Sequence, residues 1–288
     1  MLKTFLVGPK GEIFVNPAKR YVKPYWLNGT VPTTVVPAGA VSDPITFTVD
    51  NQGHFEWFYI VGHSDAPYTL TIFDTGRRRF LMNREIHSDT IVSPTNIAGA
   101  LLTGGRPHIL MESYFINVEQ AQRALQIQFR NLDTVNPNTI RLAFVGRRYY
   151  YREATPEIKE EFRQRFMAKE RTNIYFVTTD RPISLAAGAT DRFTITSTDE
   201  ADFEFLKMMA VSTGAFTWKL IDKSSGREFS PSVLRDVQGW GTADFPFILP
   251  ESFLIERNYQ FLLEVTNLTD EQNDIFVTLH GRRLYYHY

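Results

Sequence analysis

Two stretches of the chain decide the fold, "IRLAFVGRRYYY" at 140–151 and "IFVTLHGRRLYYHY" at 275–288. In each, an alternating apolar run leads into Gly-Arg-Arg and, one residue later, Tyr-Tyr. Alternation with a period of two is typical of a strand with one buried face. Either this motif contacts a ligand or partner, or it closes a structural unit that occurs twice.

Further matches between the two halves of the chain favour the structural explanation. They occur in the same order in both halves, with insertions confined to polar or Gly-rich stretches, which indicates an internal duplication. The matched stretches begin "YWLNG" at 25 and "YFVTT" at 175, and continue with "FEWFYIVGHS" at 55–64 and "FEFLKMMAVS" at 203–212, "GRRRF" at 76–80 and "GREF" at 226–229, and "PHILMESYFI" at 107–116 and "PFILPESFLI" at 246–255. The Gly-Arg-Arg strand would then close each unit.

The alternating runs, such as Ile45, Phe47 and Val49, are separated by turn-forming clusters and long connections. This pattern predicts an all-β protein made of two tandem antiparallel β-sandwiches of the jelly-roll or Greek-key type. The expected divisions are an N-terminal arm at 1–24, a first β-sandwich at 25–152, a linker helix at 153–173 and a second β-sandwich at 174–288.

One amphipathic helix is predicted between the halves, in "TPEIKEEFRQRFMAKERT" at 155–172. Thr155 is a good N-cap, and a proline follows at the first helical position. Ile158, Phe162 and Phe166 recur on one face. The helix is expected to lie on one sandwich; alternatively, Phe162 and Phe166 dock a partner or a neighbouring subunit.

Composition excludes several classes of function. The 288 residues carry 31 Lys and Arg against 32 Asp and Glu, so the balanced charge favours neither nucleic acid nor an anionic membrane. The absence of cysteine excludes thiol catalysis, thiolate metal sites and disulfides. No apolar run approaches the length of a membrane span, and the N-terminus lacks a signal-peptide pattern. The protein is therefore expected to be made and kept in a cytoplasm, or to be exported only as part of an assembly.

No catalytic signature is assembled in the sequence. The six histidines lack the paired spacings that bind one metal ion, and no cofactor motif occurs, so neither metal nor cofactor is expected. "FDTG" at 73–76 resembles the catalytic loop of aspartic proteases, but the matching stretch at 222–226 is "DKSSG". The arginines that follow would keep Asp74 ionised, so a hairpin turn is the better interpretation. The paired glutamates Glu56 with Glu204 and Glu112 with Glu251 recur because the halves do, and the protein is not expected to be an enzyme.

The phase of the closing strands predicts where their arginines point. Continuing the alternation places Arg148 and Arg283 toward the edge of each core, where an arginine requires an anion. The other recurring charge near each strand predicts that Arg148 pairs with Glu112 and that Arg283 pairs with Glu251. A bulge at the glycine would reverse this phase.

Outward-facing side chains define possible interfaces. The candidates are Arg77, Arg78, Arg79, Arg147 and Arg282, together with Trp240 in the loop "QGWGTAD". A nucleic-acid surface could use the same arginines with the tyrosines of 149–151 as stacking partners. The tyrosines alternate between the two faces of a strand, however, and the overall charge is balanced, so nucleic acid is not the expected partner.

Tandem cysteine-free sandwiches with a Pro-rich arm and no catalytic motif resemble virion proteins of tailed bacteriophages, of the capsid-decoration, collar or tail-adaptor type. The resemblance is one of architecture over residues 25–288, without a diagnostic motif. It implies a structural role in a virion, with other copies of itself and other virion proteins as partners, and assembly in the host cytoplasm.

A carbohydrate-binding or carbohydrate-cleaving sandwich is the alternative. Four tryptophans could provide platforms on which sugars stack: Trp26, Trp57, Trp218 and Trp240. Trp57 and Trp218 lie in predicted strands and are expected in the cores, which leaves the loop residue Trp240 as the best candidate for a contact surface.

Overall fold

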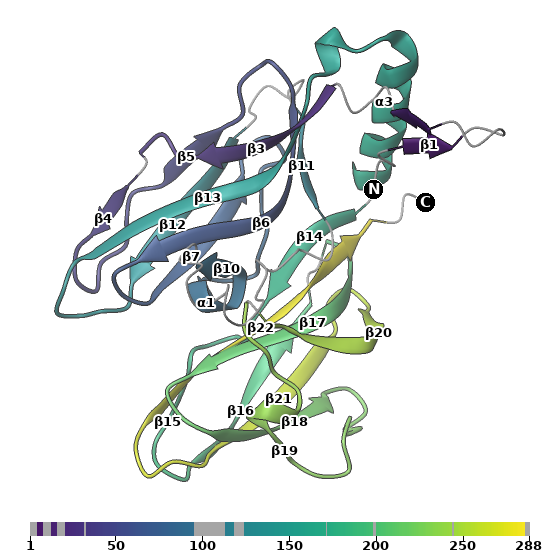
Figure 1. Ribbon diagram of the computed structural model, residues 1–288. Helices are drawn as coiled ribbons and strands as arrows, with labels where there is room; N and C mark the ends of the chain where they lie inside the picture. Colours follow the sequence, from purple (N-terminus) through teal and green to yellow (C-terminus); the bar gives the residue numbers. More distant parts are fainter. Residues whose placement is uncertain are drawn as a thin grey trace.

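The computed structural model describes residues 5–7, 13–15, 21–31, 33–94, 113–117, 124–170, 172–197, 200–243 and 245–285. The fold is all-β, as the sequence predicts, and two sandwiches lie against each other, with helix α3 (Pro156–Glu170) beside the first (Figure 1). Strands β1 (Phe5–Val7) and β2 (Ile13–Val15) form a separate antiparallel pair in the predicted arm.

The first sandwich consists of two sheets. One has at its centre β6 (His54–Ser64) and β13 (Asn138–Tyr149), with β3 (Val22–Asn28), β4 (Thr34–Val36), β10 (Val92–Pro94) and β11 (Tyr114–Ile116) at its edges. The other contains β5 (Ile45–Thr48), β12 (Ala124–Asn131), β7 (Tyr68–Asp74), β8 (Arg79–Phe80) and β9 (Ile86–His87). Strand β3 begins at Val22, three residues before the predicted start of the sandwich.

The second sandwich repeats this strand order. One sheet runs β14 (Thr172–Val177), β22 (Asn273–Leu284), β17 (Asp202–Ser212) and β20 (Phe247–Ile255), with β15 (Ile183–Leu185) also on β22. The other runs β16 (Thr190–Thr196), β21 (Gln260–Asn267), β18 (Phe216–Asp222) and β19 (Leu234–Arg235). Each Gly-Arg-Arg strand, β13 or β22, therefore lies at the centre of its sheet.

The two halves also share a β-bulge at the same place. In the first half, Val145 pairs with Tyr59 and Gly146 with Trp57, so Phe58 is the extra residue. In the second half, Lys207 pairs with His280 and Phe205 with Gly281, so Leu206 is the extra residue. Phe58 and Leu206 occupy matching positions in the sequence. A shared bulge is a strong sign of common origin because it is a local backbone feature rather than a general property of sandwiches.

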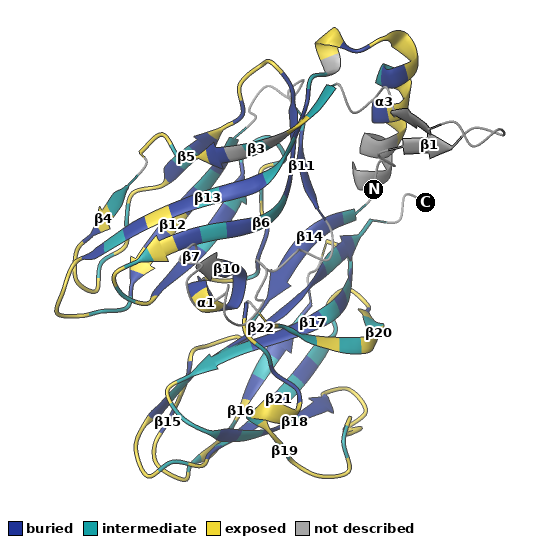
Figure 2. Cartoon of the chain, viewed as in Figure 1, coloured by how far each residue is buried: buried dark blue, intermediate teal, exposed yellow. Residues whose placement is uncertain are grey.

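Each sandwich has its own apolar core, shown as dark blue bands along the strands in Figure 2. The alternating runs supply it because every second side chain of a strand points to the same face. The predicted core tryptophans are confirmed: Trp57 is fully buried in the first core, and Trp218 is buried in the second.

Strand β14 belongs to both cores. Its alternation sends Ile174 and Phe176 into the first core and Tyr175 and Val177 into the second. All four side chains are buried, which explains why this stretch is apolar on both faces. The two sandwiches consequently form one packed body rather than two separate domains joined by a linker.

Polar contacts complete the junction around α1 (Ser88–Ile91), which lies between the sandwiches. The Asn83 side chain donates to the Thr178 carbonyl at 2.9 Å and accepts from the Thr178 N–H at 3.0 Å. The hydroxyls of Thr90 and Thr278 hydrogen-bond at 2.9 Å. The Thr90–Thr278 bond is buried and the two Asn83 bonds are partly buried, so they favour one relative orientation of the halves because a mismatch would leave polar groups unsatisfied.

Helix α3 begins at Pro156, as the sequence predicts, and packs on the first sandwich. Phe162 is fully buried, and its ring lies edge-on to Tyr149 at 5.1 Å between centroids. Within the part of the chain that the structure describes, no helix is both long and apolar enough to cross a membrane.

Candidate functional site

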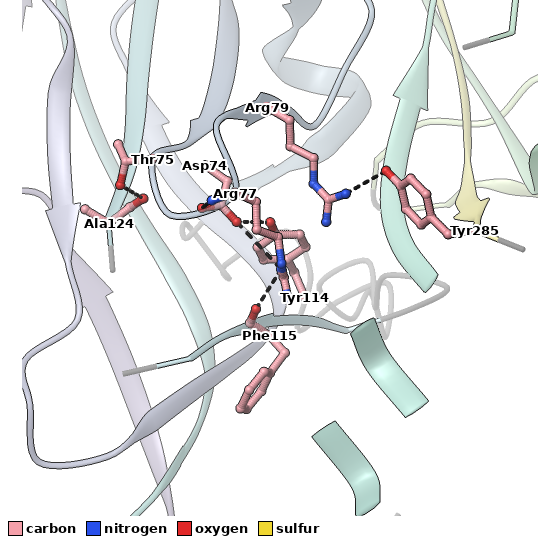
Figure 3. A network of polar contacts seen from close by, with 8 residues as sticks. All are labelled: Asp74, Thr75, Arg77, Arg79, Tyr114, Phe115, Ala124 and Tyr285. Atoms are coloured by element: carbon pink, nitrogen blue, oxygen red, sulfur yellow. Dashed lines mark hydrogen bonds and ion pairs between the residues drawn. The ribbon is translucent and has the colours of Figure 1, made fainter. Parts of the chain in front are cut away.

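The Asp-Thr-Gly hairpin at the end of β7 is built around Asp74 (Figure 3). Its carboxylate accepts a hydrogen bond from the Tyr114 hydroxyl and one of 3.0 Å from the backbone N–H of Arg77, whose guanidinium lies 3.6 Å from the second carboxylate oxygen. Arg77 also donates to the Phe115 carbonyl at 3.0 Å. Burial raises the pKa of Tyr114, which keeps this hydroxyl protonated as a donor. Asp74 therefore anchors a turn.

The matching aspartate, Asp222, has the same role. It accepts hydrogen bonds from the backbone N–H of Ser224 at 2.8 Å and from the hydroxyls of Ser224 and Ser225 at 2.7 and 2.6 Å. Hydrogen bonds from Ser225, Tyr259 and Ser224 lower the pKa of the Asp222 carboxyl. The hairpin interpretation of both aspartates is thus supported by their contacts.

The two hairpins have equal length, which corrects the sequence match of Gly76 with Gly226. Phe73 pairs with Phe80, and Ile221 pairs with Glu228, so Arg78 occupies the position of Gly226. Both residues have a left-handed backbone, with φ of 53° and 70°. That conformation is easy for glycine and costly for arginine.

Arg79 continues from the same hairpin to the second sandwich (Figure 3). Its guanidinium donates to the Tyr285 hydroxyl at 2.7 Å and lies 5.1 Å from the centre of the Tyr285 ring. One Tyr of the closing motif therefore contacts the arginine cluster of the other half.

The glycine of each Gly-Arg-Arg motif faces the backbone of the bulged strand. A Cβ on Gly146 would lie 1.9 Å from the Glu56 carbonyl oxygen, and one on Gly281 would lie 2.1 Å from that of Glu204. These distances are far below contact, so only glycine fits. The extra residue of each bulge lies on the opposing strand, β6 or β17. The side chains that follow the glycine on β13 and β22 therefore keep alternating between the two faces as before it.

The second arginine of each motif is directed inward, as predicted. Arg148 and Arg283 are only 3% and 6% exposed. Each guanidinium lies over the tyrosine that begins the matching stretch of its own half, at 4.7 Å from the Tyr25 ring centre and 3.6 Å from that of Tyr175.

The predicted partner of Arg283 is wrong, and that of Arg148 is not tested. Arg283 pairs with Glu200 at 2.7 Å, not with Glu251, which is exposed on the irregular part of β20 where the pairing with β17 shifts register. Arg148 pairs with Asp50. Its predicted partner, Glu112, lies outside the described residues. Both observed partners come from the loop that precedes β6 or β17.

The glutamates that do recur in the polar network are Glu56 and Glu204. Glu56 accepts hydrogen bonds from the Ser113 and Tyr149 hydroxyls, while Glu204 accepts from the Ser252 hydroxyl and from Arg282, the latter at 2.6 Å. Ser113 and Ser252 are the serines of the repeated "ES" dipeptide. The repeated serine therefore makes a contact that both halves share.

The three remaining arginine candidates have different surroundings. Arg78 is exposed, Arg147 lies over the Phe58 ring at 4.7 Å, and Arg282 forms an ion pair with Glu204. Trp240 is 9% exposed and packs against Trp218 at 5.3 Å, so its proposed role as a surface contact is wrong. Its loop folds back onto the core because Gly239 before it gives the Trp218 ring room. The structure does not describe the side chains of Phe166 and Trp26.

A pocket of about 610 Å³ opens at the junction of the sandwiches. Its lining includes Arg78, Arg79 and Arg84 from the first half, and Tyr175, Glu200 and Arg283 from the second. This pocket could not be predicted by comparing the two halves of the sequence, because each half contributes different residues to the surface between them. No cluster of three metal-ligating side chains occurs within the described ranges.

No protein-family model matches the chain, and no curated protein matches its sequence. Three similar solved structures come from Sulfolobus turreted icosahedral virus, the VP2 subviral particle of infectious bursal disease virus, and the PBSX exported protein XepA. Their identities are 8%, 9% and 10%, and their TM-scores are 0.24, 0.23 and 0.21. The matches cover 88%, 92% and 97% of this chain and 61%, 72% and 99% of the other chains. The chain thus spans less than two thirds of the turreted-virus chain.

Proposed function

We propose that the protein is a non-enzymatic structural component of a virus particle, where it binds copies of itself and other particle proteins. A capsid or head-to-tail component of a tailed bacteriophage, assembled in the host cytoplasm, is the specific form of this proposal. The alternative of a sugar-binding protein lacks support at Trp240, because the ring that would stack on a sugar is buried.

The observation that carries the proposal is an exposed apolar segment on the second sandwich. Of the twelve large apolar side chains exposed among the described residues, six lie between 229 and 254. They are Phe229, Val233, Val237, Phe245, Ile248 and Leu254. A contiguous exposed apolar patch is typical of protein–protein contact, and this stretch supplies half of the exposed apolar side chains from which such a patch could form.

The same segment includes an open sheet edge. Strand β20 ends its sheet, and among the described strands none pairs with its outer side. Strand β20 spans Phe247–Ile255, so the edge that it presents is nine residues long. A long, partly apolar edge strand invites another chain to pair with it.

The packed junction supports a mechanical role. Strand β14 contributes side chains to both cores, so force applied to one sandwich is transmitted to the other through a shared strand. The recurring carboxylates serve the fold: Glu56 and Glu204 accept hydrogen bonds from neighbouring strands.

Light scattering on the purified chain tests this proposal. We expect a mass of several chains, and a fall toward one chain in the double variant Ile248→Lys, Leu254→Lys. The control Val135→Lys changes an apolar residue of the first sandwich that is even more exposed, and it should leave the mass unchanged. A wild-type monomer that binds soluble sugars would overturn the assembly proposal.

A further inference from the structure

The junction pocket has an excess of positive charge. Four arginines line it, Arg78, Arg79, Arg84 and Arg283, against two carboxylates, Asp180 and Glu200. Glu200 is paired with Arg283, and Asp180 accepts a hydrogen bond from the Thr194 backbone N–H. Among the described residues, Arg78, Arg79 and Arg84 form no ion pair, so the pocket favours an anion.

The backbone at Arg78 is an independent sign of function. Its left-handed conformation, with φ of 53°, occurs at the position that the second hairpin fills with Gly226. An arginine there costs conformational energy that glycine avoids, and such strain is concentrated at functional positions. Asn258, the other non-glycine residue with positive φ among those described, also lines the pocket.

Two of the arginines retain unused donors. The Nε–H groups of Arg79 and Arg283 are buried, and the described part of the chain supplies no acceptor for either. Arg283 is 6% exposed and is held over Tyr175 at 3.6 Å, so its guanidinium is fixed before any ligand arrives. Preorganised guanidinium groups are well suited to oxyanions because their planar donors match two oxygens at once.

We propose that this pocket binds a tetrahedral oxyanion of the phosphate or sulfate class, either free or carried on a saccharide. Both halves of the chain provide arginines, so the bound anion would also strengthen the junction. Phe73 and Phe80 in the same pocket give a carried group apolar surface to contact. This inference does not depend on assembly into a particle.

Calorimetric titration of the intact chain tests the proposal with inorganic phosphate, sulfate and a sulfated disaccharide, each against chloride at equal ionic strength. We expect saturable binding of the oxyanions and none of chloride. Disaccharide binding about tenfold or more tighter than sulfate would assign the carried form, whereas equal affinity would assign the free ion.

The decisive variant is Arg78→Gly, which adopts the residue used by the second hairpin and therefore should fold at least as well. We expect oxyanion affinity to fall by about tenfold or more, because charge-assisted hydrogen bonds are lost, while the melting temperature without anion is unchanged or higher. The control Arg227→Ala removes the arginine at the position of Arg79 in the other hairpin, outside the pocket, and should bind normally. Unchanged binding by Arg78→Gly, or equal binding of chloride, would overturn the proposal.

Discussion

The two Gly-Arg-Arg strands have the same backbone pairing, with a bulge at the matching place. They differ in which side chains donate hydrogen bonds to the matching glutamates, Glu56 and Glu204. In the first half, Glu56 is 1% exposed and accepts from the neutral hydroxyls of Tyr149 and Ser113. In the second half, Glu204 is partly exposed and accepts from the Arg282 guanidinium and the Ser252 hydroxyl. The bulge, the glycine and the serine are common to both halves, whereas the second hydrogen-bond donor to the glutamate differs, Tyr149 in one half and Arg282 in the other.

The difference follows from what covers each strand. Helix α3 places Phe162 against Tyr149, and the position of Tyr149 is occupied by Leu284 in the second half. Under the helix, a tyrosine can supply both an apolar ring and a hydrogen-bond donor. Where Glu204 remains partly exposed, the long side chain of Arg282 can reach it at little desolvation cost. After a duplication, then, the backbone feature is retained and the side chains adapt to local burial.

The largest expected effect comes from the shared feature. Gly146→Ala and Gly281→Ala each place a Cβ within 2.1 Å of a carbonyl oxygen, so each should destabilise the fold by more than about 4 kcal/mol or prevent folding. Denaturant unfolding measures the loss.

The matched control is Gly188→Ala, since a Cβ there meets no atom within 4 Å and only the positive φ of 65° is disfavoured. Its cost should be about 1 kcal/mol. If Gly146→Ala were no worse than this control, the close packing at the bulge would be refuted.

Between about pH 6.5 and pH 4, an acid-dependent loss of stability is expected from His54 in the first half. Burial lowers the pKa of His54 to about 4, an effect that the Asn117 hydrogen bond partly opposes, and the matching residue of the second half is Asp202. The unfolded chain binds this proton near pH 6.5 and the folded chain only near pH 4, so stability falls as the pH decreases between these values. The contribution of His54 should be up to about 3 kcal/mol.

Denaturant unfolding of the wild type and of His54→Asn across this pH range measures the difference. The variant should lose less stability than the wild type on acidification. Parallel pH profiles would show that His54 titrates normally in the folded chain.

The smallest effects should separate the two ways of satisfying the glutamate. Tyr149→Phe removes one of the hydroxyls that serve buried Glu56 and should cost about 2 kcal/mol. Arg282→Met removes the partner of Glu204, whose ion pair is partly exposed, and should cost less than about 1 kcal/mol. Equal losses in chemical denaturation would contradict the proposed difference in burial.

Sequence comparison predicts the repeated architecture because Gly146 and Gly281 serve a backbone feature that both copies keep. It also predicts the inward direction of Arg148 and Arg283, since the bulge lies on the opposing strand and leaves their phase intact. The acidic partners could not be predicted in this way. Asp50 lies five residues before Phe55 and Glu200 three before Phe203, so these acids do not occupy matching positions.

The packing of the two sandwiches against each other also could not be predicted from the sequence pattern. "IYFV" at 174–177 is apolar throughout, and nothing in it distinguishes a strand buried in one core from a strand shared by two. The pocket arginines from 78 to 84 come together with Arg283 because the two sandwiches pack against each other through this strand and the polar contacts beside it. The packing of the two copies therefore created features that neither copy carries by itself.

Differential scanning calorimetry of the whole chain tests most directly whether the two copies form one body. The contribution of β14 to both cores predicts a single unfolding transition, in which the calorimetric and van't Hoff enthalpies agree. Two resolved transitions, with Gly281→Ala lowering only one of them, would contradict the account.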